Sequence, residues 1–157
     1  MTQGWFPEMR WHYNLFSIHR SLVQLGGRWV RPRPYVIVSA IGPAGTVVRE
    51  ALIDSGSDDT VFPDSVATLL GLDLSQAPHG VLAGIGQRPV QIRYARINLR
   101  LSDGQEHREW LAWVGFTNQP LRRPLLGFAG FLQFFTATFH GDLEEVELTV
   151  NRLYPGT

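Results

Sequence analysis

Two apolar segments joined by a tight turn are the feature that most restricts what this chain can fold into. Residues 34–41 (PYVIVSAI) and 46–53 (TVVREALI) are rich in β-branched side chains, and a Gly-Pro-Ala-Gly run separates them at 42–45. β-Branched residues favour strands, and glycine with proline between two such segments is typical of a hairpin turn. The pattern therefore predicts an antiparallel hairpin that ends at Ile53.

The rest of the chain repeats this pattern of short apolar segments between turns. Sixteen glycines and ten prolines among 157 residues favour many strands over helices. We expect further strands over residues 91–101, 109–116, 134–140 and 146–150, and short helices over 63–70 and 127–132. A change of phase in the first of these strands predicts a bulge near Ala95. The prediction is an all-β fold with one or two short helices.

The domain organisation predicted from length is simple. The chain is long enough for one domain, which we place at residues 31–157. Residues 1–30 lack a clear period and form an N-terminal extension of uncertain structure.

Composition excludes several classes of function. Fourteen arginines balance fourteen acidic residues, so no net charge attracts nucleic acid or an anionic membrane. The absence of lysine and cysteine excludes Schiff-base and thiol chemistry. No apolar run reaches the roughly 18–20 residues of a membrane span, and charged residues interrupt the first thirty positions as a signal peptide would not allow. We therefore expect a cytoplasmic protein with no membrane or nucleic-acid partner.

The segment that carries chemistry is residues 51–62 (ALIDSGSDDTVF), in which an apolar strand delivers Asp54 into a turn at Ser55 and Gly56. A buried carboxylate must be hydrogen-bonded or paired, and glycine lets a backbone N–H approach it closely. An Asx-turn that merely ends a strand is one interpretation of this tripeptide. A calcium loop is another, although the spacing of the nearby aspartates departs from the EF-hand pattern.

The run at 52–61 resembles the active-site segment of retropepsins, the retroviral-type aspartic proteases, in which two apolar residues precede Asp-Thr/Ser-Gly and Ala/Ser-Asp-Asp-Thr-Val. The resemblance implies that the triplet Asp54, Ser55 and Gly56 is catalytic. It also implies that the residues that follow, Ser57, Asp58 and Asp59, contribute to substrate binding.

Two further segments match the family in the same order along the chain. The glycine-flanked tip Gly84, Ile85 and Gly86 looks like the flap, a hairpin that closes over substrate. The later run Leu125, Leu126 and Gly127 resembles the apolar-apolar-glycine motif that crosses behind the catalytic loop and leads into a helix. Three ordered matches across about residues 33–150 are more specific than any one of them.

Aspartic-protease chemistry needs two carboxylates that share one proton, and this chain carries one such triplet. A twofold axis through the site would bring two copies of Asp54 together. The resemblance thus implies a retropepsin-like closed barrel with one lobe per chain, and a homodimeric aspartic endopeptidase. Polypeptide would be its substrate, and it would use neither metal nor other cofactor. A non-catalytic retropepsin-like domain for dimerisation or peptide binding is the alternative, and a metal-binding β-domain comes third.

Some positions depart from the family or invite a specific expectation. Phe128 stands where retropepsins usually place an arginine that pairs with the aspartate at the position of Asp58. Either Arg122 or Arg123 replaces that arginine, or the brace is missing. The hydroxyl of Ser57 is expected to donate to the Asp54 carboxylate and so favour an acidic optimum.

Overall fold

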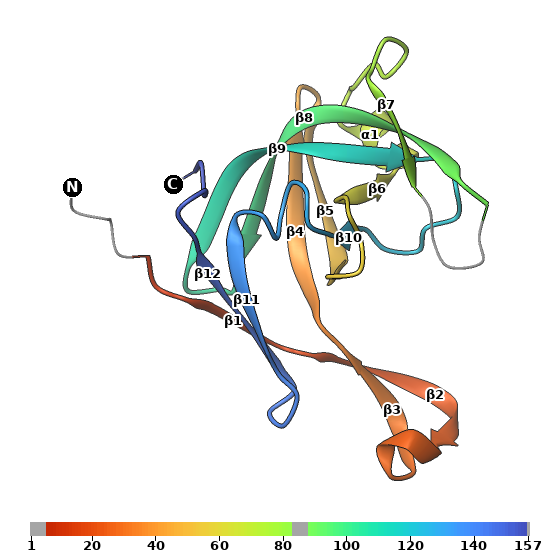
Figure 1. Cartoon of the computed structure of the whole chain (residues 1–157), viewed down its shortest axis with the longest axis vertical. Coiled ribbons are helices and arrows are strands. Elements are labelled where there is room, and N and C mark those ends of the chain that lie inside the picture. Colours follow the sequence, from red (N-terminus) through yellow and green to blue (C-terminus); the bar gives the residue numbers. More distant parts are fainter. Residues whose placement is uncertain (1–5, 83–87, 157) are drawn as a thin grey trace.

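The computed structural model describes residues 6–82 and 88–156, and these form a body of strands with one α-helix among them (Figure 1). The helices are η1, a 3₁₀ turn (Val23–Leu25), and α1 (Asp64–Leu69). The strands are β1 (Met9–His12), β2 (Asn14–Leu22), β3 (Arg28–Arg33), β4 (Tyr35–Gly42), β5 (Gly45–Ile53), β6 (Val61–Pro63), β7 (His79–Leu82), β8 (Val90–Ser102), β9 (His107–Thr117), β10 (Leu125–Leu126), β11 (Phe135–His140) and β12 (Glu145–Val150). The predicted mainly β fold is confirmed.

Six strands close into a barrel. Their order is β4, β5, β10, β6, β9 and β8, and β8 pairs back onto β4, where Leu101 lies opposite Val38. Closure leaves none of these six strands with an unpaired edge over the paired stretch. β7 pairs with the first residues of β8, beyond the part that contacts β4. The closed barrel expected from the sequence is confirmed, and so is the hairpin of β4 and β5, with Gly42 opposite Gly45 at its turn.

The expected bulge near Ala95 is wrong. β8 and β9 keep one unbroken antiparallel register from Arg93 opposite Phe116 to Ser102 opposite His107. The change of phase has another cause, because β8 exchanges its second neighbour along its length. It pairs with β7 up to Arg93 and with β4 from Asn98 onward. A strand that passes between two environments can change its buried face without an inserted residue.

A second sheet covers the barrel and shares its core. β12 lies between β11 and β1, so the N-terminal strand joins the C-terminal hairpin. Met9 of β1 is 1% exposed and belongs to the same apolar cluster as Trp110 of the barrel and Phe135 of β11. The placement of a domain boundary at residue 30 stays a prediction, but residues 9–12 contribute to the core.

Residues 14–33, here called the arm, extend from this body and contact it through side chains, among them Arg28 with Glu144. β2 and β3 pair only with each other, and η1 closes their turn. Figure 1 shows the arm leaving the barrel at the end where β5 finishes. β3 runs directly into β4, so the arm continues one strand of the barrel outward.

The helix expected over 63–70 is confirmed as α1, and the helix expected over 127–132 is wrong. Residues 128–134 form a series of turns instead. Gly130 has a φ of 87°, which interrupts a right-handed helix, and Ala129 pairs with Asp59 as an isolated bridge. Among the described residues, no helix is both long enough and apolar enough to cross a membrane.

Candidate active site

Asp54 occupies the first position after β5, and a neighbouring strand fixes its backbone. β10 runs parallel to β5, with Leu126 beside Ile53. The backbone N–H of Asp54 donates to the carbonyl of Leu126 at 3.0 Å, and the N–H of Ile53 donates to Pro34 at 3.1 Å. The carboxylate therefore emerges from a rigid strand end, which is a precise way to hold a reactive group.

A tight turn follows Asp54 and engages one of its two carboxylate oxygens. The N–H of Gly56 donates to Oδ1 of Asp54 at 2.9 Å, and the N–H of Ser57 donates to its carbonyl at 3.2 Å. This is an Asx-turn, which was one of the interpretations of the Asp-Ser-Gly tripeptide. The second oxygen, Oδ2, has no hydrogen-bond partner among the described residues. Asp54 is half-buried and Ser55 is exposed, so both are open to a further group.

The expectation for Ser57 is wrong. Its hydroxyl donates to the backbone carbonyl of Asp59 at 2.7 Å, and a serine hydroxyl carries a single proton to donate. The side chain is 8% exposed. Ser57 therefore stabilises the loop itself and does not donate to the Asp54 carboxylate.

The segment that begins at Leu125, Leu126 and Gly127 passes directly behind this loop. The N–H of Phe128 donates to Ser57 at 2.9 Å, and the N–H of Ala129 donates to Asp58 at 2.9 Å. A Cβ on Gly127 would lie 2.2 Å from the carbonyl oxygen of Asp59 and 2.5 Å from that of Ser57. Only glycine fits, because no heavy atom can approach a backbone oxygen so closely. The segment that begins with this motif thus packs behind residues 57–59, and the motif's role in a catalytic site stays a prediction.

The brace expected around Asp58 is missing from the described residues. Arg123 pairs instead with Glu50, at 3.0 Å from Nε to Oε1. Neither Arg122 nor any other arginine forms an ion pair with Asp58 among the described side chains, and the Asp58 carboxylate is exposed. Phe128, at the family's arginine position, is 61% exposed. The face of the loop that carries Asp58 and Phe128 is therefore open.

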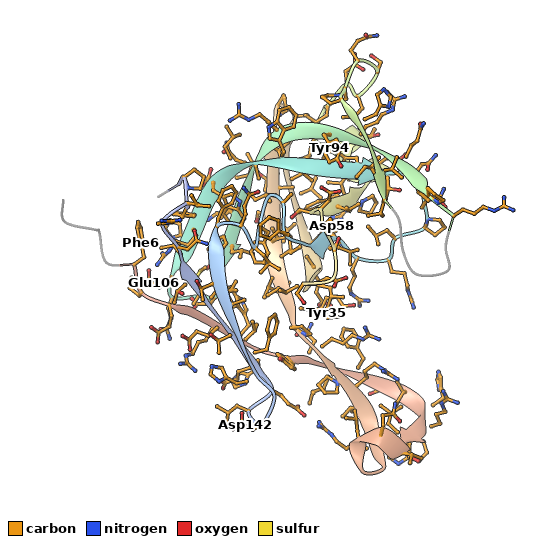
Figure 2. All side chains as sticks on the ribbon, in the orientation of Figure 1. Phe6, Tyr35, Asp58, Tyr94, Glu106 and Asp142 are labelled. Atoms are coloured by element: carbon orange, nitrogen blue, oxygen red, sulfur yellow. The ribbon has the colours of Figure 1, made fainter. Side chains whose placement is uncertain are left out.

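Asp59 has a partner that the sequence did not reveal. The hydroxyl of Tyr94 on β8 donates to Oδ2 of Asp59 at 3.1 Å. Burial, and then the charge and hydrogen bond of Asp59, raise the pKa of Tyr94 to about 12. Tyr94 therefore stays protonated and remains a donor at any physiological pH. Figure 2 labels Tyr94 on β8 and, below it in that view, Asp58.

Asp54, Asp58 and Asp59 border a cleft of about 630 Å³. Its lining combines the loop of residues 54–59 with β7, the start of β8 and the segment before β10: Asp54, Gly56, Ser57, Asp58, Asp59, Val81, Leu82, Val90, Thr117, Gln119, Pro120, Leu121 and Leu125. A second hollow of about 820 Å³ lies beside α1 and shares Val90 and Gln119 with the cleft. The sequence did not predict that residues 117 and 119–121 line the cleft, because a loop without a periodic pattern does not indicate what it faces.

The predicted flap falls partly outside the structure. β7 and β8 form an antiparallel hairpin in which Leu82 lies opposite Val90. The tip residues Gly84, Ile85 and Gly86 lie outside the described residues. Val81 and Leu82 on one flank and Val90 on the other line the cleft, which places the described part of the hairpin beside Asp54.

Within residues 6–82 and 88–156, no group of three or more histidine, aspartate or glutamate side chains is placed to hold a metal ion. Asp58 is exposed, whereas Asp59 is half-buried against Tyr94.

Comparison with known proteins gives structural neighbours. A retropepsin-like aspartic protease from Rickettsia conorii is similar over 92% of this chain and 96% of its own, at 15% identity and a TM-score of 0.49. The retroviral protease-like domain of Ddi1 from Leishmania major is similar over 80% of this chain and 94% of its own, at 17% identity and a TM-score of 0.47. No family model matches the chain, and no curated protein matches its sequence. This chain resembles retropepsin-like domains.

Proposed function

We propose that this chain is one subunit of an aspartic endopeptidase, in which Asp54 from each of two copies forms the catalytic pair. The observation that carries the proposal is the geometry of Asp54. The carboxylate is fixed at a strand end, has one oxygen held by Gly56 and one oxygen free, and borders a cleft of about 630 Å³. A cleft of this size suits side chains of an extended peptide.

The single carboxylate per chain supports a homodimer. Ser55 is exposed beside Asp54 and makes no hydrogen bond with the described residues, so its hydroxyl is available to a second copy. Phe128, which is exposed on the segment that passes behind this loop, adds an apolar side chain to that face. An isologous contact here would place both copies of Asp54 on one axis, where the two carboxylates hold a single proton between them.

The proposed chemistry follows from that shared proton. The ionised carboxylate takes a proton from a water molecule as the water oxygen bonds to the peptide carbonyl carbon, and the protonated carboxyl donates its proton to the carbonyl oxygen. The tetrahedral diol then collapses and the C–N bond breaks. The pair gives one proton to the nitrogen of the leaving amine and takes one from a diol hydroxyl, so that it again holds a single proton. Asn at this position can neither accept the water proton nor share one with its neighbour.

The β7–β8 hairpin is proposed to act as the flap, with Gly84, Ile85 and Gly86 at its tip. Its described flanks line the cleft, so closure of the tip would exclude water from the bound peptide. The Asp58 and Asp59 side chains border the same cleft and are proposed to contact the substrate beyond the scissile bond.

The deciding experiment is cleavage of a denatured protein by the purified chain. We expect cleavage that pepstatin-type inhibitors block, and Asp54→Asn should lower kcat/KM by at least about a thousand-fold because a reacting carboxylate is lost. Asp64→Asn is the matched control, since Asp64 is exposed and lies outside the cleft. Asp54→Asn should leave the thermal midpoint unchanged, because asparagine keeps the acceptor for Gly56.

Activity that survives Asp54→Asn would refute the assignment. Saturable peptide binding with no cleavage in either form would favour the alternative, a non-catalytic peptide-binding or dimerisation domain.

A further inference from the structure

The arm presents apolar side chains that the chain itself leaves uncovered. Leu15 is 54% exposed, Trp29 is 60% exposed and Val23 is 89% exposed. A two-stranded ribbon alone is marginally stable in water, since it has no second layer to bury its apolar side chains against. Its observed exposure therefore indicates that another surface normally lies against it.

One face of the arm is particularly suited to binding protein. Side chains alternate along a strand, so Trp29, Arg31 and Arg33 of β3 share a face. Arg31 and Arg33 are half-buried, because Phe16 beside Arg31 packs against Arg123 and Tyr35, but they have no ionic partner among the described residues. The exposed Arg20 on β2 has none there either. Tryptophan and arginine are the residues most enriched at the centres of protein interfaces.

Charge indicates which protein would bind. The arm holds four of the fourteen arginines and none of the fourteen acidic residues, so its formal charge is +4 and that of the rest of the chain is −4. Arg28 pairs with Glu144 of its own chain, which leaves three arginines of the arm for a partner. A second copy of this chain thus offers a body of complementary charge to the arm. A membrane or a nucleic acid would have to supply anionic groups from outside this protein, whereas a second copy of the chain carries its own acidic side chains.

The location of the arm makes a second copy the nearest candidate. Pro34, the residue that joins β3 to β4, accepts a hydrogen bond at 3.1 Å from Ile53, which immediately precedes Asp54. The arm therefore leaves the barrel beside the strand end that carries the catalytic carboxylate (Figure 1). The proposed site is incomplete without a second Asp54, so the copy that supplies it must lie within reach of an arm whose strands extend roughly 20 Å.

We propose that the arm is a clasp that binds the body of a second copy of this chain through the face of Trp29, Arg31 and Arg33. The inference rests on the proposed function for its choice of partner. In an isologous dimer the two arms contact reciprocally, so each contact is made twice. A substitution in the arm therefore counts twice in the free energy of dimerisation, and its effect on the dissociation constant is squared.

The test is the solution mass of the purified chain, measured by sedimentation across a range of concentrations. All samples carry Asp54→Asn, so that self-cleavage does not disturb the measurement. The arm variants are Trp29→Ser and the double charge reversal Arg31→Glu with Arg33→Glu. Their matched controls lie on the body: Trp113→Ser, which is 51% exposed, and Arg100→Glu with Arg152→Glu, both exposed and without an ionic partner among the described residues.

We expect the arm variants to raise the dimer dissociation constant by at least about a hundred-fold and the controls by less than about threefold. Added salt should weaken the parent dimer and have less effect on the charge-reversed variant, because screening acts on charges that the variant has lost. Far-UV circular dichroism and the thermal midpoint report whether each variant is folded. An unfolded charge-reversed variant leaves the test to Trp29→Ser and to the salt dependence of the parent.

The clasp is overturned if the arm variants dimerise as tightly as the controls, or if the parent stays monomeric at every concentration. It is also overturned if the same substitutions in the chain with Asp54 intact abolish cleavage but leave the mass unchanged, since the arm would then contact substrate. The two proposals fail separately. If the chain with Asp54 intact forms a dimer that needs its arms but cleaves no substrate, the protease proposal is refuted and the clasp is retained. If the dimer is active and tolerates the arm substitutions, the clasp is refuted and the protease proposal is retained.

Discussion

The loop of residues 54–59 and the arm lie at the same end of the barrel and are held by opposite means. The loop is fixed by backbone hydrogen bonds: the N–H of Asp54 donates to Leu126, and the N–H groups of Phe128 and Ala129 donate to the loop. The arm is held to the body by side chains, chiefly Arg123 at its base and Arg28 near its tip. Backbone bonds tolerate most side-chain changes but no change of backbone spacing, whereas side-chain anchors are removed by single substitutions. The loop should therefore be insensitive to most substitutions and fail abruptly at a few, and the arm should loosen by degrees.

The largest effect is expected at Gly127. Gly127→Ala places a Cβ against two backbone carbonyl oxygens that have no room to move, so we expect a loss of more than about 3 kcal/mol in the free energy of unfolding. Urea denaturation measures it. Gly141→Ala is the control, because a Cβ at Gly141 meets no atom within 4 Å. Equal stabilities for the two variants would contradict the described packing behind the loop.

An intermediate effect is expected at the base of the arm. The Arg123 guanidinium lies 4.9 Å from the ring centre of Phe16 and 5.0 Å from that of Tyr35, and it pairs with Glu50. Arg123→Ala should cost about 1 kcal/mol of stability and release the arm from the barrel. Hydrogen exchange should then accelerate in arm peptides but not in β5. Arg122→Ala, at an exposed neighbour, is the control, and equal acceleration in the arm and β5 would count against separate anchoring.

The smallest effect is a pH dependence of the arm alone. The hydrogen bond and charge of Arg28 hold the pKa of the Glu144 carboxyl below its ordinary value, although burial opposes them. A lowered folded-state pKa means that the tether is intact above the ordinary value near 4.5 and is lost as pH falls through the folded value. We expect arm amides to lose protection on acidification in that window before the barrel does.

Glu144→Gln supplies the control for this measurement, because its tether cannot titrate. Hydrogen exchange of the arm, compared between the parent and this variant at each pH, removes the intrinsic effect of acid on exchange. Arm protection that falls identically in both proteins would show that the ion pair does not anchor the arm.

The same contrast explains which features the sequence predicts. The β4–β5 hairpin and the loop after it follow from local rules, since β-branched runs, a Gly-Pro turn and the Asp-Ser-Gly tripeptide each specify their own backbone. The helix wrongly expected over 127–132 depends on contacts between distant segments, whereas the Ser57 hydroxyl binds the carbonyl of Asp59 only two residues away. Gly130 adopts its φ of 87° beside β9, where a Cβ would meet the carbonyl of Trp113 at 2.6 Å. No window of sequence contains both partners.

The structure of the N-terminal residues could not be predicted from the sequence for a related reason. β1 has only four residues and finds its partner at β12, more than a hundred positions away. Met9 is buried only because that pairing carries it into the core. The arm gives a weak signal because, with few apolar residues covered on either face, its strands lack the alternation that burial imposes.

One Asp54 per chain has a genetic consequence. If two copies build each active site, a cell that makes an inactive copy beside the intact one distributes both among the same dimers. Random pairing at equal expression leaves only about a quarter of the dimers with two functional aspartates. An allele encoding Asp54→Asn would therefore act as a dominant inhibitor, because its product folds, pairs and occupies the intact chain. An allele that also removes Trp29 from the arm would be recessive, since its product no longer competes for the partner.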